Sequence, residues 1–229
     1  MVKALDNDSL CNKTVEWVVL TKAPVPGLVK TRLISVLGEL GACDVYEQLL
    51  TRLQETLQKV VSAHTLKIPA SQVALWVAGD AEHKAFKGWQ KLGDRVAYYQ
   101  QPSGTDEGAI DLGTRMALAV QSALSRNHIP ILIGVDVPDL DADYLIHCLQ
   151  KIHQHELVIS PAEDGGYGLL GMVNFYPELF VDKDWGTNTV FASTKRDIKK
   201  LNIDVAYLPE VWDVDEVVDV ARWERLKNN

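Results

Sequence analysis

One stretch, residues 129–140 with the sequence IPILIGVDVPDL, constrains the fold more than any other part of the chain. Its first five residues are a continuous apolar run, which predicts a buried parallel strand because helices cover both faces of such a sheet. In open α/β sheets ligands bind beyond the carboxyl ends of the strands. We therefore expect chemistry at Asp136, which follows the strand. The alternative is that Asp136 only begins the next helix, since Pro138 and Asp139 also suit a helix start.

Bulk composition indicates one globular domain. The chain has 229 residues, of which 47% are hydrophobic, enough for a full core, and its net charge of −8 argues against nucleic acid as a partner. Three isolated cysteines without C-x-x-C spacing fit the reducing cytoplasm. No apolar run approaches the roughly 18 residues of a membrane span. We expect a polar tail over residues 1–14 and a single cytoplasmic domain over residues 15–229.

Strand and helix patterns alternate along the chain. Strands are predicted over residues 15–21, 72–78, 95–99, 129–133, 157–160 and 205–208. Helices are predicted over residues 38–64, 82–91, 110–125 and 142–154. Another helix is predicted after residues 185–187, ending at about residue 200. A terminal helix is predicted to open at residues 212–216 and to end near residue 226. This order predicts an α/β fold with a mixed, mostly parallel sheet and helices on both faces.

A basic loop follows the first predicted strand. Two prolines and Gly27 exclude helix or central strand, and Lys22, Lys30 and Arg32 supply cations beside the Thr31 hydroxyl. Such a loop can cradle a diphosphate or triphosphate. It is not a Walker A loop, because the second glycine before the lysine is missing. The alternative is a basic surface loop with no ligand.

A second loop, residues 161–171, joins two carboxylates to two glycines and an aromatic ring. Glu163 and Asp164 could accept a hydroxyl proton or reach a metal, and Gly165 and Gly166 permit close approach of a ligand that Tyr167 could stack on. A hairpin turn between two strands explains the Asp-Gly pair equally well, and both interpretations can hold together.

Two further acidic groups have a structural explanation beside the functional one. Asp111 and Arg115 lie one helical turn apart, as an i,i+4 pair would. Asp213 with Glu216 is typical of a capping box. However, the basic loop, Asp136, the second loop and residues 213–215 all follow strands. Their oxygen donors, without His or Cys, favour Mg²⁺ or Mn²⁺ bridging nucleotide phosphates.

Several segments together resemble the DUF2064 family, in the same order along the chain. They are KAPVPGLVKTRL at 22–33, DLGTRM at 111–116, IGVDVPDL at 133–140, SPAEDGGYGLLG at 160–171 and DVD at 213–215. Members of this family are glycosyltransferase-A-like proteins related to the phospholactate guanylyltransferases of cofactor F420 synthesis, and some are associated with arsenosugar biosynthesis. The resemblance implies a nucleotide-diphospho-sugar transferase-like (GT-A) fold and a nucleotide or nucleotide-sugar donor.

The resemblance also implies roles for particular residues. The donor nucleotide would contact Thr21, Ala23, Pro24, Lys30, Arg32, Gly104, Asp111 and Arg115. The acceptor would contact Glu163, Gly165, Gly166, Tyr167 and Trp185. The metal would be held by Asp136 with Asp213 or Asp215. The chain departs from the family pattern at two places: residues 105–110 intervene between Gly104 and Asp111, and Gly186 replaces a serine after Trp185.

These observations lead to three hypotheses about function. The first is metal-dependent glycosyl transfer from a nucleotide sugar to a small-molecule acceptor, with catalytic roles for Asp136 and for Asp164 as base. The second is nucleotidyl transfer from a nucleoside triphosphate to a phosphorylated small molecule. The third is a nucleotide-binding protein without turnover.

Overall fold

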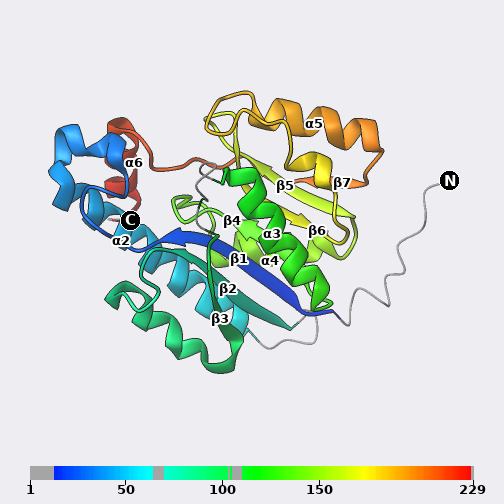
Figure 1. Ribbon diagram of the computed structural model, residues 1–229, viewed down its shortest axis with the longest axis horizontal. Coiled ribbons are helices and arrows are strands. Elements are labelled where there is room, and N and C mark those ends of the chain that lie inside the picture. Colours follow the sequence, from blue (N-terminus) through cyan, green and yellow to red (C-terminus); the bar gives the residue numbers. More distant parts are fainter. Residues whose placement is uncertain (1–12, 64–69, 103, 105–109, 228–229) are drawn as a thin grey trace.

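The computed structural model describes residues 13–63, 70–102, 104 and 110–227, and its centre is a seven-stranded sheet in the order β3-β2-β1-β4-β6-β5-β7 (Figure 1). The strands are β1 (Val15–Lys22), β2 (Ser71–Ala78), β3 (Val96–Gln100), β4 (Ile129–Ile133), β5 (Leu157–Pro161), β6 (Tyr167–Met172) and β7 (Val205–Tyr207). Strand β6 runs antiparallel to β4 and β5, whereas the other neighbours are parallel. The predicted mixed, mostly parallel sheet is therefore confirmed.

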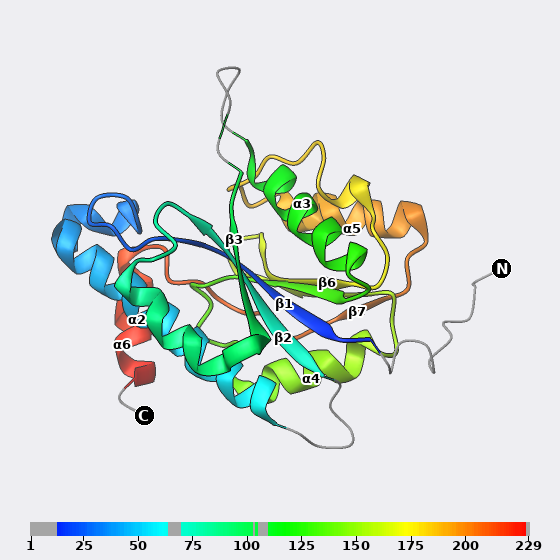
Figure 2. The same cartoon turned by 60° about the horizontal axis from the view of Figure 1, so that its bottom comes forward.

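Helices cover both faces of this sheet (Figure 2). They are η1 (Thr31–Leu33), α2 (Ile34–Ser62), η2 (Lys84–Arg95), α3 (Leu112–Ser125), α4 (Ala142–Ile152), η3 (Pro177–Leu179), α5 (Val190–Leu201) and α6 (Val217–Lys227). Alternate residues of β1 divide between the two layers: Trp17 and Val19 join the core under α2, η2 and α4, and Val18 joins the core under α3 and α5. Among the described helices, none is long and apolar enough to cross a membrane.

The central strand β4 has the predicted position and burial. All five of its residues are buried, and β1 and β6 flank it. Beyond its end, the Gly134 amide donates to the Gly168 carbonyl at 3.0 Å, and the Val214 amide donates to the Asp136 carbonyl at 2.9 Å. These bonds fix the backbone on both sides of Asp136 at the carboxyl end of the parallel strands.

Strands β5 and β6 form the hairpin that the Asp-Gly pair predicts. Gly165 at its turn has φ +86°, and a Cβ atom there would lie 2.3 Å from the Asn188 carbonyl oxygen. The Gly165 carbonyl in turn accepts a hydrogen bond of 2.8 Å from the Phe191 amide. The hairpin turn is therefore held against the start of α5, and only glycine fits at this position.

Two of the predicted helices differ from those in the structure. The helix predicted over residues 82–91 is the 3₁₀ segment η2, which bends at Gly93 with φ +57°. The predicted helix 38–64 starts earlier, as α2 from Ile34, with a kink at Gly38. Residues 1–12 of the predicted tail, and residues 64–69 and 105–109, lie outside the described part.

The terminal helix begins at Val217, later than predicted, because residues 212–216 are not helical. Val211 forms a bridge with Ala162 beside β5. The predicted capping box between Asp213 and Glu216 is also wrong, since the Asp219 carboxylate accepts from the amides of Asp215 (3.1 Å) and Glu216 (2.7 Å). Asp213 is thereby left for another role.

Candidate active site

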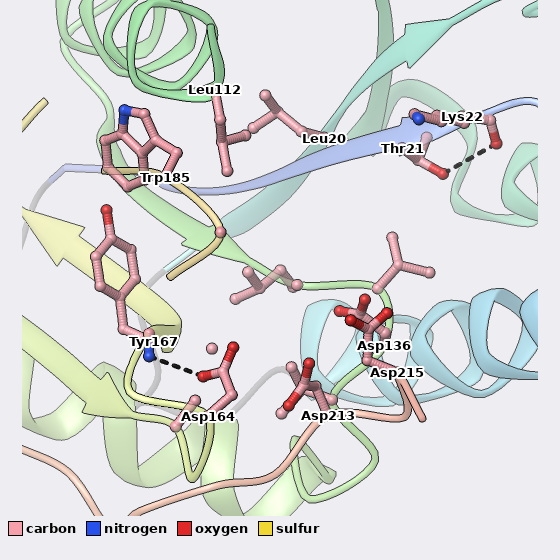
Figure 3. Close-up of a pocket in the computed structure, with 18 of the residues that line it drawn as sticks. Leu20, Thr21, Lys22, Leu112, Asp136, Asp164, Tyr167, Trp185, Asp213 and Asp215 are labelled. Atoms are coloured by element: carbon pink, nitrogen blue, oxygen red, sulfur yellow. Dashed lines mark hydrogen bonds between the residues drawn. The ribbon is translucent and has the colours of Figure 1, made fainter. Parts of the chain in front are cut away.

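A cavity of about 610 Å³ lies beyond the carboxyl ends of β1 and β4. Its walls come from the basic loop, the start of α3, the β5–β6 turn, residues 185–187 and the non-helical residues Asp213 and Asp215 before α6. Figure 3 shows Asp136, Asp213 and Asp215 on one side of this space, with Tyr167 and Trp185 on the other. The convergence predicted for these strand ends is confirmed.

The basic loop places one lysine deep in the cavity. Lys30 adopts a left-handed backbone conformation with φ 45° directly before η1. Its Nζ lies 2.7 Å from Asp136 Oδ2 and 3.5 Å from Asp215 Oδ1. The Lys30 side chain is only 5% exposed, whereas that of Asp136 is 36% exposed. The lysine thus lies behind the carboxylate, which faces the cavity.

Charges in this cluster determine the pKa values of its members. Burial works against the charge of Lys30, but nearby Asp136 and Asp215 raise its pKa above 10.5. Burial likewise favours neutral Asp136, and the charge and hydrogen bond of Lys30 lower its pKa below 3.8. Arg32 makes a further ion pair with Asp215. Lys30 and Arg32 are therefore each paired with carboxylates of the protein.

Two more carboxylates complete the acidic side. Burial, followed by repulsion from Asp136 and Asp164, raises the pKa of Asp213 from 3.8 to about 6. Asp164 is fixed by its own turn, because its Oδ1 accepts from the Gly166 amide at 2.7 Å. Figure 3 shows the Asp164 side chain between Tyr167 and Asp213. Carboxylates therefore outnumber the cations of the basic loop.

The donor set suits a magnesium or manganese ion that is shared with a substrate. Within the described ranges, no group of three or more His, Cys, Asp or Glu side chains is arranged to hold a metal by itself. Mg²⁺, however, is commonly bound by one or two carboxylates together with water and substrate phosphates. Asp136 and Asp215 already share one cation, the Lys30 ammonium. These two carboxylates therefore fit a metal that takes its remaining ligands from phosphates.

A hydrogen-bonded network fixes the wall beyond β1. The Thr21 hydroxyl and the Tyr46 hydroxyl are 2.9 Å apart, and Gln101 Nε2 donates to the Thr21 carbonyl at 2.9 Å. Arg115 Nη1 donates to Gln101 Oε1 at 3.1 Å. Sequence reasoning missed Tyr46 and Gln101. Tyr46 has the spacing of a core residue of its helix, but the position of Gln101 directly after β3 could have indicated the site.

Other residues predicted to bind the nucleotide lie elsewhere. Ala23 and Pro24 are buried and do not line the cavity. Asp111 caps α3, with its Oδ1 accepting from the Thr114 amide at 2.7 Å, and it pairs with Arg115 only through its backbone carbonyl. Gly104 is exposed and does not line the cavity. The predicted i,i+4 ion pair of Asp111 and Arg115 is wrong because Asp111 serves as the helix cap.

The residues predicted on the acceptor side divide similarly. Gly166, Tyr167 and Trp185 line the cavity, and the two rings meet edge to face with centroids 6.3 Å apart. Burial raises the pKa of Tyr167, so its hydroxyl stays protonated at neutral pH. Glu163 instead binds Arg222 of α6 at 2.9 Å. Gly165, as described above, supports the turn.

The glycine of the DLG segment also has a structural role. A Cβ atom at Gly113 would lie 2.2 Å from the Phe180 carbonyl oxygen and 2.6 Å from Trp185 Nε1. Gly113 therefore lets the loop that carries Trp185 pack directly on α3. The buried Lys183 fixes the same loop through Asp197 at 2.6 Å and the Glu178 carbonyl at 2.9 Å.

Fold and site together define a nucleotide-diphospho-sugar transferase-like protein. Residues 50–187 match the family described as "Uncharacterized protein conserved in bacteria (DUF2064)", and the chain belongs to this family. A comparison with curated protein sequences gave no match.

Solved structures are similar over nearly the whole chain. A protein from Desulfovibrio desulfuricans G20, provisionally described as a nucleotide-diphospho-sugar transferase, is 30% identical over 93% of this chain and 88% of its own, with a TM-score of 0.76. The 4-diphosphocytidyl-2C-methyl-D-erythritol synthase from Anaerococcus prevotii is 11% identical (98% and 100% covered; TM-score 0.59). The inositol-1-phosphate CTP transferase from T. maritima is 12% identical (91% and 92%; TM-score 0.52). The latter two show the fold alone.

Proposed function

We propose that this protein is a metal-dependent transferase that moves a glycosyl group from a nucleotide sugar to a hydroxyl of a small-molecule acceptor. The observation that carries the proposal is the division of charge in the cavity. Among the described residues that line it, the cations are Lys22, Lys30, Arg32 and Arg115, on β1, its loop and α3. The wall formed by residues 162–169, 185–187 and 213 has carboxylates and aromatic rings but no cation among those same described residues.

The basic wall suits the donor. Lys30 and Arg32 can neutralise a diphosphate, and the hydrogen-bonded wall of Thr21 and Gln101 lies next to them. Mg²⁺ or Mn²⁺ on Asp136 and Asp215 would neutralise charge that develops on the leaving phosphate. Such electrostatic stabilisation is commonly the largest contribution to group transfer.

The acidic wall suits a neutral acceptor. Asp164 Oδ1 is held by the Gly166 amide, which leaves Oδ2 to accept the proton of an acceptor hydroxyl. The acceptor oxygen then forms a bond to the anomeric carbon, and the bond from this carbon to the donor phosphate breaks, releasing a nucleoside diphosphate. Trp185 and Tyr167 offer ring surfaces against which an acceptor can pack.

The comparisons support transferase chemistry at the general level. The D. desulfuricans relative is described as acting on nucleotide-diphospho-sugars. Nucleotidyl transfer to a phosphorylated molecule would need cations on the acceptor wall as well, and the described lining residues supply none there. The charge division therefore favours glycosyl transfer over nucleotidyl transfer.

The proposal is tested by thermal shift, with nucleoside triphosphates and nucleotide sugars each added with Mn²⁺, Mg²⁺ or EDTA. A ligand at about 100 times its Kd adds roughly 2.7 kcal/mol of apparent stability. We expect a metal-dependent shift with a nucleotide sugar. A shift confined to triphosphates would support nucleotidyl transfer, and no shift with any ligand would contradict the proposed function.

Asp164→Asn separates chemistry from binding. The variant should keep the donor-induced thermal shift. Its rate of transfer, measured with an acceptor that the wild-type protein uses, should be about 100-fold or more below the wild-type rate, because general base catalysis contributes a rate factor of about 10² to 10⁴. Glu163→Gln is the matched control, since Glu163 binds Arg222 and does not line the cavity. Equal rates for both variants would remove Asp164 from the mechanism.

A further inference from the structure

The Lys30 ammonium lies where the proposed metal ion would have to bind. Its Nζ is 2.7 Å from Asp136 Oδ2 and 3.5 Å from Asp215 Oδ1, so it bridges the two carboxylates that fit a divalent ion. With the Lys30 side chain only 5% exposed, this contact is not a loose surface pair. The left-handed backbone at Lys30, rare outside glycine, aims the side chain into the cluster.

An ammonium and a metal cannot hold these oxygens together. A Mg²⁺ ion lies about 2.0–2.1 Å from its oxygen ligands, so an ion on Asp136 and Asp215 would overlap the position of Nζ. Repulsion between the two cations would add to this steric conflict. Metal binding through Asp136 Oδ2 and Asp215 Oδ1 therefore requires that Lys30 leave these two oxygens.

We infer that Lys30 makes metal and donor binding interdependent: its ammonium occupies the metal position until a donor diphosphate takes it over. This inference rests on the proposed function and deepens it. The diphosphate supplies the negative charge that Lys30 loses on leaving Asp136, and the divalent ion supplies the positive charge that Asp136 and Asp215 lose. Each ligand thus removes a cost that the other would face alone, and the coupling is reciprocal.

Neighbouring charges favour the same exchange. Asp213 adds a third carboxylate to the lining of the same cavity, on the side of Asp136 and Asp215 (Figure 3). Arg32 remains on Asp215 and is 60% exposed, so it can reach a phosphate without leaving the cavity mouth. Replacing a single positive charge with a double one therefore reduces repulsion among carboxylates that are already crowded.

The test measures Mn²⁺ binding without any nucleotide, by the electron paramagnetic resonance signal of the unbound ion. Lys30→Met should bind Mn²⁺ at least about tenfold more tightly than the wild-type protein, because the competing ammonium is gone. Lys87→Met is the control with the same change of charge, since Lys87 is exposed and does not line the cavity, and the Mn²⁺ affinity of this variant should equal that of the wild-type protein. Lys30→Gln serves as a second variant should Lys30→Met fail to fold.

Each outcome has a distinct meaning. Equal or weaker Mn²⁺ binding by the Lys30 variants would overturn the inference, while the proposed metal site would stand if Asp136→Asn still reduced binding. Lys30→Met could also bind Mn²⁺ more tightly while the double variant Lys30→Met/Asp136→Asn binds it equally tightly. That result would place the ion elsewhere, and would overturn both the inference and the metal part of the proposed function. Tighter binding that depends on Asp136 would support both.

Discussion

The two ends of β1 carry two clusters of charged residues that differ in their balance. At the amino end, Glu16 is fully buried and contacts Arg126 at 2.6 Å, His128 at 2.8 Å and Gln72 at 2.8 Å. At the carboxyl end, Asp136 and Asp215 make the ion pairs with Lys30 and Arg32, and these carboxylates and Asp213 line an open cavity.

This difference separates a structural ion cluster from a binding site. Both oxygens of Glu16 have partners within the protein, so a ligand could only replace contacts that already exist. The cluster at the carboxyl end has more carboxylates than cations, and a divalent ion can balance this surplus negative charge. We call the cluster of Glu16 the closed cluster and the cluster of Asp136, Asp213 and Asp215 the open cluster. Burial of charge alone does not identify function; incomplete neutralisation beside a cavity does.

The largest expected effect comes from changing the open cluster. Asp136→Asn should reduce the proposed transfer rate about 1,000-fold or more, because the metal would lose its main charged ligand and the leaving phosphate would lose the metal's stabilising charge. The free energy of unfolding should fall by only about 1–2 kcal/mol, since Lys30 keeps Asp215 and the crowding of carboxylates decreases. Steady-state kinetics and urea denaturation measure the two quantities. An unchanged rate would remove Asp136 from the mechanism.

Changing the closed cluster should have the opposite profile. Glu16→Gln should cost roughly 3 kcal/mol of unfolding free energy, because Arg126 and His128 lose their buried partner. Donor affinity measured well below the melting temperature should not change. Asp204→Asn is the control, since its pair with His155 is exposed and worth less than about 1 kcal/mol. A Glu16 variant as stable as this control would mean that the closed cluster is not structural.

Sequence patterns predict the open cluster much better than the closed one. Asp136, Lys30 and the β5–β6 turn each directly follow a recognisable strand, so the topology alone brings them together. Glu16 lies inside a strand pattern, and its partners are between 56 and 112 residues away, so no local signal indicates the contacts. Tyr46 was missed for the same reason, because its role depends on a tertiary contact with Thr21, whereas the position of Gln101 directly after β3 did offer a local signal.

A smaller effect concerns pH. Folded Asp213 has a pKa of about 6, above its ordinary 3.8, so its protonation stabilises the fold at low pH, and this contribution is lost as the pH rises from about 4 to 6. The Asp213→Asn variant has no carboxyl group at this position, so its stability does not fall for this reason as the pH rises. After allowance for solvent screening, we expect the variant to gain roughly 1 kcal/mol on wild type between pH 4.5 and 7.5. Urea midpoints in EDTA measure it, and parallel pH curves would contradict the assignment.

The smallest expected change in stability comes from Arg32→Gln. Arg32 is 60% exposed, so loss of its pair with Asp215 should alter the unfolding free energy by less than about 0.5 kcal/mol. Donor affinity should still fall about fivefold at low salt, and this difference should shrink as salt screens the charges. Calorimetric titration at two ionic strengths measures both trends. A salt-independent difference would indicate a geometric role for Arg32.

Asp215 pairs with Arg32 and Lys30 of the basic loop, from which it is separated in the sequence by 183 and 185 positions, respectively. Contacts of such long range form late, after much of the chain has become ordered. Asp215 reaches Lys30 only when residues 211–215 have aligned beside β5 and under Asp136. A chain in which this last segment had not yet docked would have Asp136 but would lack the carboxylates of Asp213 and Asp215 at the cavity. Ligand binding at this cavity should therefore select chains whose folding is complete.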